Sequence, residues 1–174
     1  MGKALEPKFI TAKHYRAFGR VVQAFVQIET VYAQIVLRVL KVEDGTGAFL
    51  LAGYNYDGLK NLVKSMVGES NLPDHESKEI LARIDKVNDK ANLRNNVAHN
   101  PWKPGKRKGS IKSMVLKTKG NLKIMGIEDN EKDWLASELD AEADEILRRG
   151  MAVGQFFVDR GIHLGLPKVE KRKK

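Results

Sequence analysis

Apolar residues at helical spacing over a long stretch near the start of the chain constrain its fold more than any other feature of the sequence. From about Thr11 to Lys41 apolar residues return every three or four positions, which predicts one long helix with a single apolar face. The predicted apolar face consists of Phe18, Val21, Val22, Phe25, Ile28, Tyr32, Ile35, Val36, Val39 and Leu40.

Three further helices are predicted from the same kind of pattern. One covers about residues 56 to 67, after a glycine-rich connection at 45 to 53 that has room for a helical turn. The next begins at Asp74, after a proline, and runs to about Ala98. The last begins at Ser137, which with Asp140 resembles a capping box. Its predicted packing seam consists of Leu139, Ala143, Ile146, Gly150, Val153 and Phe157, and Gly150 and Gly154 would allow a neighbouring helix to approach closely.

The segment before the last helix has a different pattern. Residues 110 to 127 are rich in β-branched and apolar residues on either side of Lys-Gly-Asn, which predicts a β-hairpin. The expected fold is therefore all-α, an up-and-down bundle of four or five helices with a β-hairpin inserted before the last helix. We expect one domain over residues 1 to 166, followed by a basic, disordered tail at 167 to 174.

The composition excludes several classes of protein. The chain has no cysteine, so it has no disulfides and no thiolate metal site. Its four histidines, at positions 14, 75, 99 and 163, lack the spacing of metal ligands, so no metal and no cofactor are expected, although magnesium held by scattered carboxylates stays open. The start MGKALEPKF has no apolar core for a signal peptide, and the longest apolar run, residues 48 to 53, is far shorter than the roughly 20 residues of a membrane span. We expect a cytoplasmic protein without a membrane partner.

Positive charge is concentrated in one part of the chain. The formal net charge is +9, and the eight lysines and arginines between Lys103 and Lys123 have no acidic residue among them. Such a block is suited to facing phosphates, since each cation near a polyanion releases a condensed counterion. The residues that we expect to bind RNA are Lys103, Lys106, Arg107, Lys108 and Lys112. The alternative is a solvated, flexible segment without a ligand.

Two charged residues occupy positions where packing favours apolar ones. Glu29 lies within about 20 degrees of Val22 and Val36 on the apolar face of the first helix. Arg94 continues the inward face of the third helix, which also contains Ile80, Ile84, Val87, Ala91 and Ala98. A charge-assisted pair between Glu29 and Arg94 would explain both positions, either as a structural ion pair or as part of a functional site.

A polar cluster lies at the predicted end of the third helix. Asn95 and Asn96 follow Arg94, and His99 comes shortly before Pro101, which biases Asn100 away from helical dihedral angles. On an ideal helix His99 would lie about 140 degrees from Arg94, whereas a loosened helix end could turn the imidazole toward the same pocket.

The segment Arg94-Asn95-Asn96-Val97-Ala98-His99 resembles the signature of the HEPN superfamily. The signature is an arginine, a polar residue that is often asparagine, and a histidine after four to six intervening positions, at the end of a bundle helix. The glutamate inside the first long helix also matches the family. The resemblance covers the helical bundle, whereas the hairpin and the tail are outside the basic pattern.

This resemblance implies a metal-independent, toxin-like endoribonuclease that acts as a homodimer in defence or stress response. His99 would move a proton to or from the ribose 2′-hydroxyl as it attacks the adjacent phosphate. Arg94 would neutralise charge on the phosphate, Asn95 would orient the phosphate or the histidine, and Glu29 would hold Arg94. An unidentified antitoxin or inhibitor is a further implied partner. One departure is Pro101, which stands where a branch of HEPN toxins has the tyrosine that its antitoxin modifies.

The competing hypothesis is a non-catalytic helical module that binds nucleic acid or a protein partner. In that case the polar cluster would serve only to fix how the helices pack. Cleavage of RNA in the presence of a chelator, or binding without cleavage, would distinguish the two.

Overall fold

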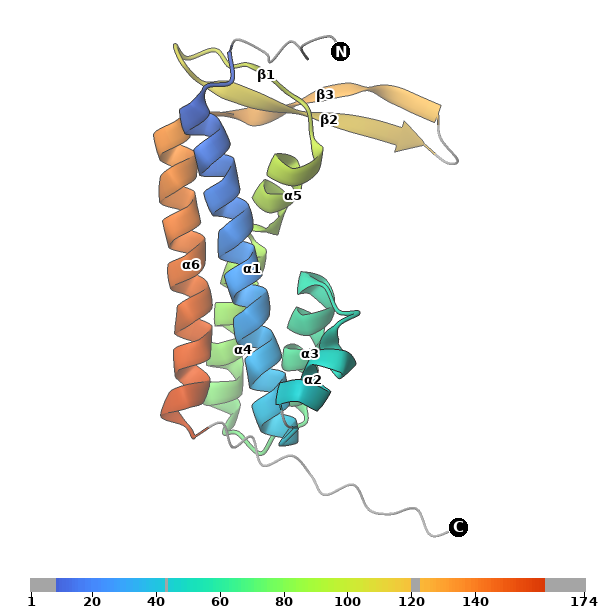
Figure 1. The fold of residues 1–174 in the computed structure, drawn as a ribbon, viewed down its shortest axis with the longest axis vertical. Coiled ribbons are helices and arrows are strands. Elements are labelled where there is room, and N and C mark those ends of the chain that lie inside the picture. Colours follow the sequence, from blue (N-terminus) through green and yellow to red (C-terminus); the bar gives the residue numbers. More distant parts are fainter. Residues whose placement is uncertain (1–8, 43, 120–122, 162–174) are drawn as a thin grey trace. The chain divides into compact units, whose positions relative to one another are not determined.

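The structure is a computed structural model that describes residues 9–42, 44–119 and 123–161. The chain is mostly helical, with a small three-stranded antiparallel sheet (Figure 1). The elements are α1 (Ala12–Leu40), α2 (Asp44–Leu51), α3 (Tyr56–Gly68), α4 (Asp74–Asn88), α5 (Ala91–His99), β1 (Trp102–Pro104), β2 (Ile111–Lys119), β3 (Lys123–Trp134) and α6 (Ala136–Asp159). The long first helix and the helix at 56 to 67 are confirmed, and the glycine-rich connection between them contains α2.

The chain forms two compact units. Unit 1 consists of Met1–Ala24 and Lys90–Ile146, and unit 2 of Phe25–Asp89 and Leu147–Lys174. The helices α1 and α6 contribute residues to both units. The predicted domain boundary at residue 166 and the predicted disordered tail at 167 to 174 lie outside the described residues and stay predictions.

Within unit 2, α1 and α6 run parallel and approach each other closely. Gly150 lies against Ile28, and one turn further along both helices Gly154 lies against Val31. A Cβ atom at position 150 would lie only 2.3 Å from Cγ1 of Ile28, so the close approach depends on this glycine. The predicted packing seam of the last helix is confirmed, since all six of its residues are buried.

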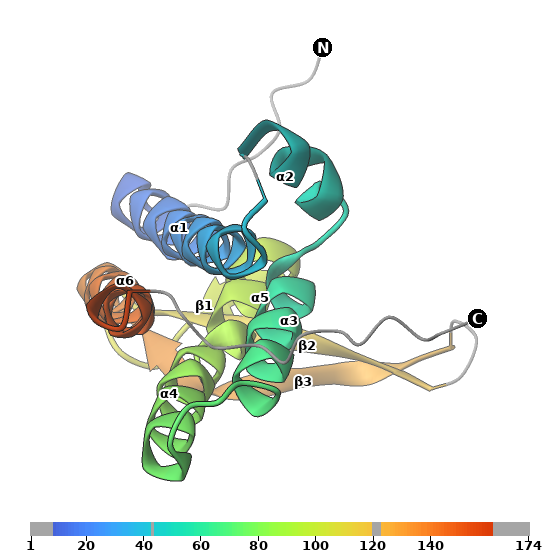
Figure 2. The ribbon, with the colours of Figure 1, turned by 90° about the horizontal axis from the view of Figure 1, so that it is seen from below.

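The helix α4 completes the core of unit 2. It runs antiparallel to α6, where the Arg83 guanidinium donates to the carbonyl of Ala152 at 3.2 Å, and antiparallel to α3, where Lys64 and Asp85 form an ion pair of 2.8 Å. Ile80, Ile84 and Val87 of α4 are fully buried. Viewed along the helices, α1, α3, α4 and α6 surround one interior (Figure 2).

The predicted third helix is in fact two helices, which corrects the prediction for Arg94. The helix α4 ends at Asn88 and α5 begins at Ala91, with Asp89 and Lys90 between them. This break changes which face of the second part points inward. Leu93 is the buried residue of α5, whereas Arg94 is half-buried. Arg94 therefore does not continue the inward face formed by α4.

The sheet of unit 1 has the strand order β1-β2-β3. The strands β2 and β3, in the segment of the predicted hairpin, pair antiparallel, and β3 continues to Trp134, beyond the predicted end at residue 127. Register shifts between Lys112 and Met114 and between Lys117 and Thr118 account for the imperfect alternation of the sequence. The strand β1 was missed, because three residues that end in proline give no strand pattern. Residues 120 to 122, in the predicted turn, lie outside the described residues.

The last helix begins one residue before the predicted Ser137, and its cap differs from the predicted one. Ala136 is the first residue of α6, and the carboxylate of Glu138 accepts a hydrogen bond of 2.9 Å from the backbone N–H of Leu135. The side chain that returns to the helix start is thus Glu138 and not Asp140. The carboxylate also benefits from the positive end of the helix dipole.

Candidate nucleic-acid interface

The end of α5 has the geometry that Pro101 predicts. Asn100 is extended, with φ −95° and ψ 143°, and its backbone N–H donates to the carbonyl of Asn96. Its side-chain amide donates to Oδ1 of Asn96 at 2.8 Å. His99 is the last helical residue, and its side chain is exposed. The helix therefore ends abruptly and presents an imidazole to solvent.

Arg94 lies earlier in the same helix and is bonded to its neighbour. Its Nη1 donates to Oδ1 of Asn95 at 3.1 Å, and the side chain of Asn95 is exposed. Glu29 is half-buried and belongs to the other unit, so the predicted support of Arg94 by Glu29 stays a prediction. Within unit 2, Glu29 is one of the acids that raise the pKa of the Tyr56 hydroxyl, although burial is the main cause of that shift.

The chain that follows His99 is fixed to the sheet and to α1. The backbone N–H of Met114 donates to the carbonyl of Pro101 at 2.8 Å, and β1 begins at the next residue. The indole ring of Trp102 stacks on Phe18 with 4.8 Å between the ring centroids.

Four of the predicted RNA-binding lysines lie on β1, on β2 or in the turn between them. Lys103 of β1 is the cross-strand partner of Lys112 of β2. Lys106 and Lys108 are in the turn and are exposed. Lys103 is four positions after His99, so their Cα atoms are at most about 14 Å apart. Lys103 is half-buried, whereas the exposed Lys106 and Lys108 are seven and nine positions after His99 in the same unit. Lys112 is only 8% exposed, which limits its access to a ligand.

Arg107 is exposed, and its side chain is held by hydrogen bonds to other parts of unit 1. Its guanidinium donates two hydrogen bonds of 2.7 Å to the carboxylate of Glu138 and a further one to the carbonyl of Asp133. The bond from Arg107, and then the one from the backbone of Leu135, lowers the pKa of Glu138 to about 2. The predicted contact of Arg107 with RNA stays a prediction, and in the structure its guanidinium joins the turn to α6.

His14 is a buried residue that the sequence analysis did not single out. It is 3% exposed, and its Nδ1 lies 2.9 Å from Oγ1 of Thr11 at the start of α1. Burial lowers the pKa of the imidazole, and the backbone of Gly109 partly offsets this effect. The basic turn therefore lies against a buried histidine. A single histidine between polar residues gave no signal of this contact in the sequence.

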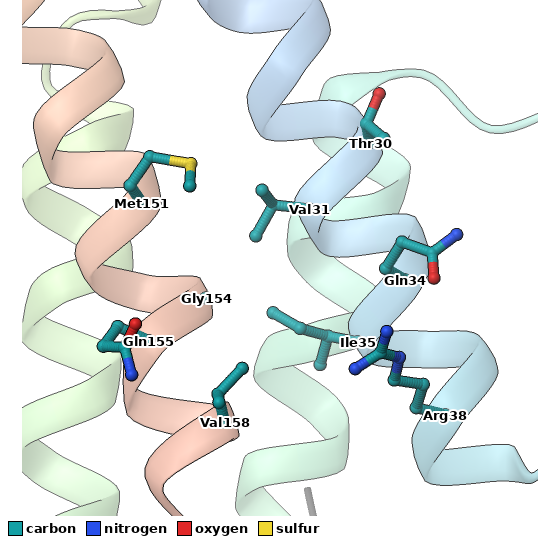
Figure 3. Close-up of a pocket in the computed structure, with 9 residues that line it drawn as sticks. All are labelled: Thr30, Val31, Gln34, Ile35, Arg38, Met151, Gly154, Gln155 and Val158. Carbon is teal, nitrogen blue, oxygen red and sulfur yellow. The ribbon is translucent and has the colours of Figure 1, made fainter.

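Two hollows are found among the described side chains. One, of about 240 Å³, is bounded by α1 and α6 within unit 2, with Met151 and Val158 facing Val31 and Ile35 (Figure 3). The other, of about 360 Å³, is in unit 1 and is lined by three glutamates and two lysines, of which Lys90 forms an ion pair with Glu142. Neither hollow is lined by Arg94 or His99.

The described residues contain no group of three or more histidine, aspartate or glutamate side chains placed to hold a metal ion. In the described part of the chain, no helix combines the length and the apolar character that crossing a membrane requires.

Comparison with known proteins does not assign the chain to a family. No protein-family model matches it. No curated protein and no solved structure matches it either.

Proposed function

We propose that this protein is a metal-independent endoribonuclease of the HEPN type that acts as a homodimer. The observation that carries the proposal is the exposed imidazole of His99 at the abrupt end of α5, with Arg94 earlier in the helix and exposed lysines in the turn that follows β1. The proposal includes an up-and-down bundle of four or five helices, a cytoplasmic location and control by an unidentified antitoxin or inhibitor.

The chemistry assigned to these residues is an intramolecular transesterification at an RNA phosphate. His99 removes the proton from a ribose 2′-hydroxyl, whose oxygen forms a bond to the adjacent phosphorus. The bond from phosphorus to the 5′ oxygen breaks, and that oxygen receives a proton from an imidazolium or from water. Arg94 neutralises the charge that develops on the phosphate oxygens, and Asn95 orients the phosphate or the histidine. The products are a cyclic phosphate and a 5′-hydroxyl end.

A dimer fits the positions of these two residues on α5. Arg94 and His99 are five positions apart, which corresponds to about 140 degrees around a helix, so the two side chains leave one α5 in different directions. Two protomers that present their α5 ends to a common groove would place Arg94 of one protomer beside His99 of the other. In the same proposal Glu29 orients Arg94.

The direct test is cleavage of RNA in the presence of a metal chelator. We expect the wild-type protein to cleave, and His99→Ala to lose at least about a hundredfold in rate, since a general acid or base contributes that much or more. The matched control is His75→Ala, because His75 is also exposed and is in the first turn of α4. Circular dichroism and light scattering would show that folding and the dimer persist. Equal cleavage by both variants, or cleavage only with added metal, would contradict the proposal.

The alternative function is a non-catalytic module that binds nucleic acid or a protein. The engagement of Arg107 by Glu138, the burial of Lys112 and the bond from Arg94 to Asn95 favour it, because each gives a charged residue a structural role. Binding of RNA by the intact dimer without any cleavage would support this alternative.

A further inference from the structure

The turn that joins β1 to β2 has a defined shape. The backbone N–H of Gly105 donates to the carbonyl of Ser110 at 2.9 Å, and the hydroxyl of Ser110 donates to the carbonyl of Arg107 at 2.8 Å. Gly109 adopts a φ of +75°, which favours glycine. A Cβ atom at Gly105 would lie 2.2 Å from Oγ of Ser110 and 2.9 Å from Cγ of Asp133, so a larger residue would not fit.

The carboxylate of Asp133, at the end of β3, holds the turn from one side. Its Oδ2 accepts hydrogen bonds from two successive backbone N–H groups, those of Lys106 and Arg107. These two bonds, the one from Lys106 first, lower the pKa of Asp133. Two successive N–H groups that converge on one carboxylate form a small anion-binding nest, and here the protein fills the nest with its own side chain.

Arg107 holds the turn from the other side. Both terminal nitrogens of its guanidinium bond to Glu138 in the first turn of α6, a bidentate geometry that fixes the direction of the side chain. The residues on either side, Lys106 and Lys108, are exposed. Arg107 is itself exposed, and what distinguishes it from its two neighbours is the pair of hydrogen bonds to Glu138.

We propose that Arg107, Asp133 and Glu138 are positioning residues, and that they present Lys106 and Lys108 as a preorganised pair for the phosphates of an RNA strand. This inference rests on the proposed function. Contacts to phosphates fix where a nucleic acid lies on a protein. A turn that is already ordered loses less conformational entropy on binding than a flexible basic segment does. In this clasp of Arg107, Asp133 and Glu138, the two acids thus promote binding of a polyanion although they carry negative charge.

Whether Glu138→Gln weakens or tightens RNA binding tests the clasp. The probe is a fluorescently labelled single-stranded RNA, titrated with the full chain in chelator at several salt concentrations. Removing a negative charge near the lysines would tighten binding if charge alone decided affinity. We expect the opposite, a dissociation constant raised about fivefold, because the two lysines lose their fixed position. Glu69→Gln is the control, since it makes the same change at an exposed position in unit 2 and is expected not to weaken binding.

A second pair of variants changes no charge. Gly105→Ala places a methyl group against Ser110 and Asp133, and we expect it to weaken RNA binding. Gly53→Ala is the control, because no atom lies within 4 Å of its added Cβ.

The two lysines are tested by salt dependence. Lys106→Ala and Lys108→Ala should each lower the slope of log affinity against log salt by about 0.7, the value for one phosphate contact to a single strand. Circular dichroism would confirm that each variant is folded. If Glu138→Gln does not fold, Gly105→Ala decides the question.

The outcomes separate this inference from the proposed function. Unchanged or tighter binding by Glu138→Gln and Gly105→Ala, with normal cleavage by the wild-type protein, would overturn the clasp alone. Weakened binding by both variants, in a protein that binds but never cleaves, would support the clasp and contradict the nuclease. Failure of the wild-type chain to bind RNA at any salt concentration would overturn both.

Discussion

The close approach of α1 and α6 in unit 2 leads to a prediction about stability that depends on Gly150. This glycine lies in the middle of α6, where alanine ordinarily stabilises a helix by about 0.5–1 kcal/mol. An added Cβ would, however, lie 2.3 Å from Cγ1 and 2.9 Å from Cδ1 of Ile28, which is only 1% exposed. Cγ1 is close to the backbone of α1, so it has little freedom to move away.

The expected change in the free energy of unfolding of Gly150→Ala follows from two opposing effects. Inserting a methyl group into a well-packed core costs about 1–3 kcal/mol. After subtraction of the gain in helix propensity, we expect Gly150→Ala to lower the free energy of unfolding by up to about 2 kcal/mol. Gly19→Ala is the matched control, because Gly19 is also inside a helix and no atom lies within 4 Å of its added Cβ. That variant should be stabilised by about 0.5–1 kcal/mol.

The assay is equilibrium unfolding in urea, followed by circular dichroism. Ile28→Ala removes both atoms that the new methyl group would meet, so the double variant should lose less stability than the sum of the two single variants. Gly154→Ala should fall between the other two glycine variants, since its Cβ would lie 3.0 Å from Val31. If Gly150→Ala were stabilised as much as Gly19→Ala, the two helices would not approach each other in this way.

Two further predictions concern acid pH and a helix end. The pKa of Glu138 is lowered to about 2 by Arg107, so its contribution to stability is complete above the ordinary carboxyl pKa of about 4.3 and is lost as the pH falls toward 2. The difference in free energy of unfolding between wild type and Glu138→Gln should therefore be constant near neutral pH and should shrink below about pH 4. A difference that grew as the pH fell would contradict the role of the Glu138 carboxylate. Lys41 has a φ of +55° at the end of α1, where the N–H of Val42 bonds to the carbonyl of Leu37. Lys41→Gly should raise the free energy of unfolding by about 0.5–1 kcal/mol and Lys41→Val should lower it, as measured by urea unfolding.

Helical spacing predicted the elements that have one continuous apolar face. The helix α1 follows this pattern from Val21 to Val36 and α6 follows it from Leu139 to Phe157, whereas Leu40, at the end of the predicted face of α1, is 50% exposed. The same reasoning failed at Asp89 and Lys90, because neither residue is a proline or glycine that would mark the break between α4 and α5. The apolar pattern of α4 continues in the sequence past Asp89 and Lys90, so it does not show that α5 buries a different face, that of Leu93.

The candidate site was predictable to a lesser degree. The abrupt end of α5 and the exposure of His99 follow from Pro101, which is a local effect. The hydrogen bonds that distinguish Arg107 from Lys106 and Lys108 do not follow from the sequence, because three adjacent cations look equivalent there. Their roles depend on Asp133 and Glu138, which lie 26 to 31 positions further along the chain.

By itself, the sequence determined where helices form, which of their faces are apolar and where a proline ends α5, since these depend on interactions within a few residues. Tertiary structure alone decided that Gly150 lies against Ile28, that Arg107 turns toward α6 and that His14 is buried beside the basic turn. Each of these depends on atoms that are distant in the chain and meet only after folding, and no local pattern specifies such partners.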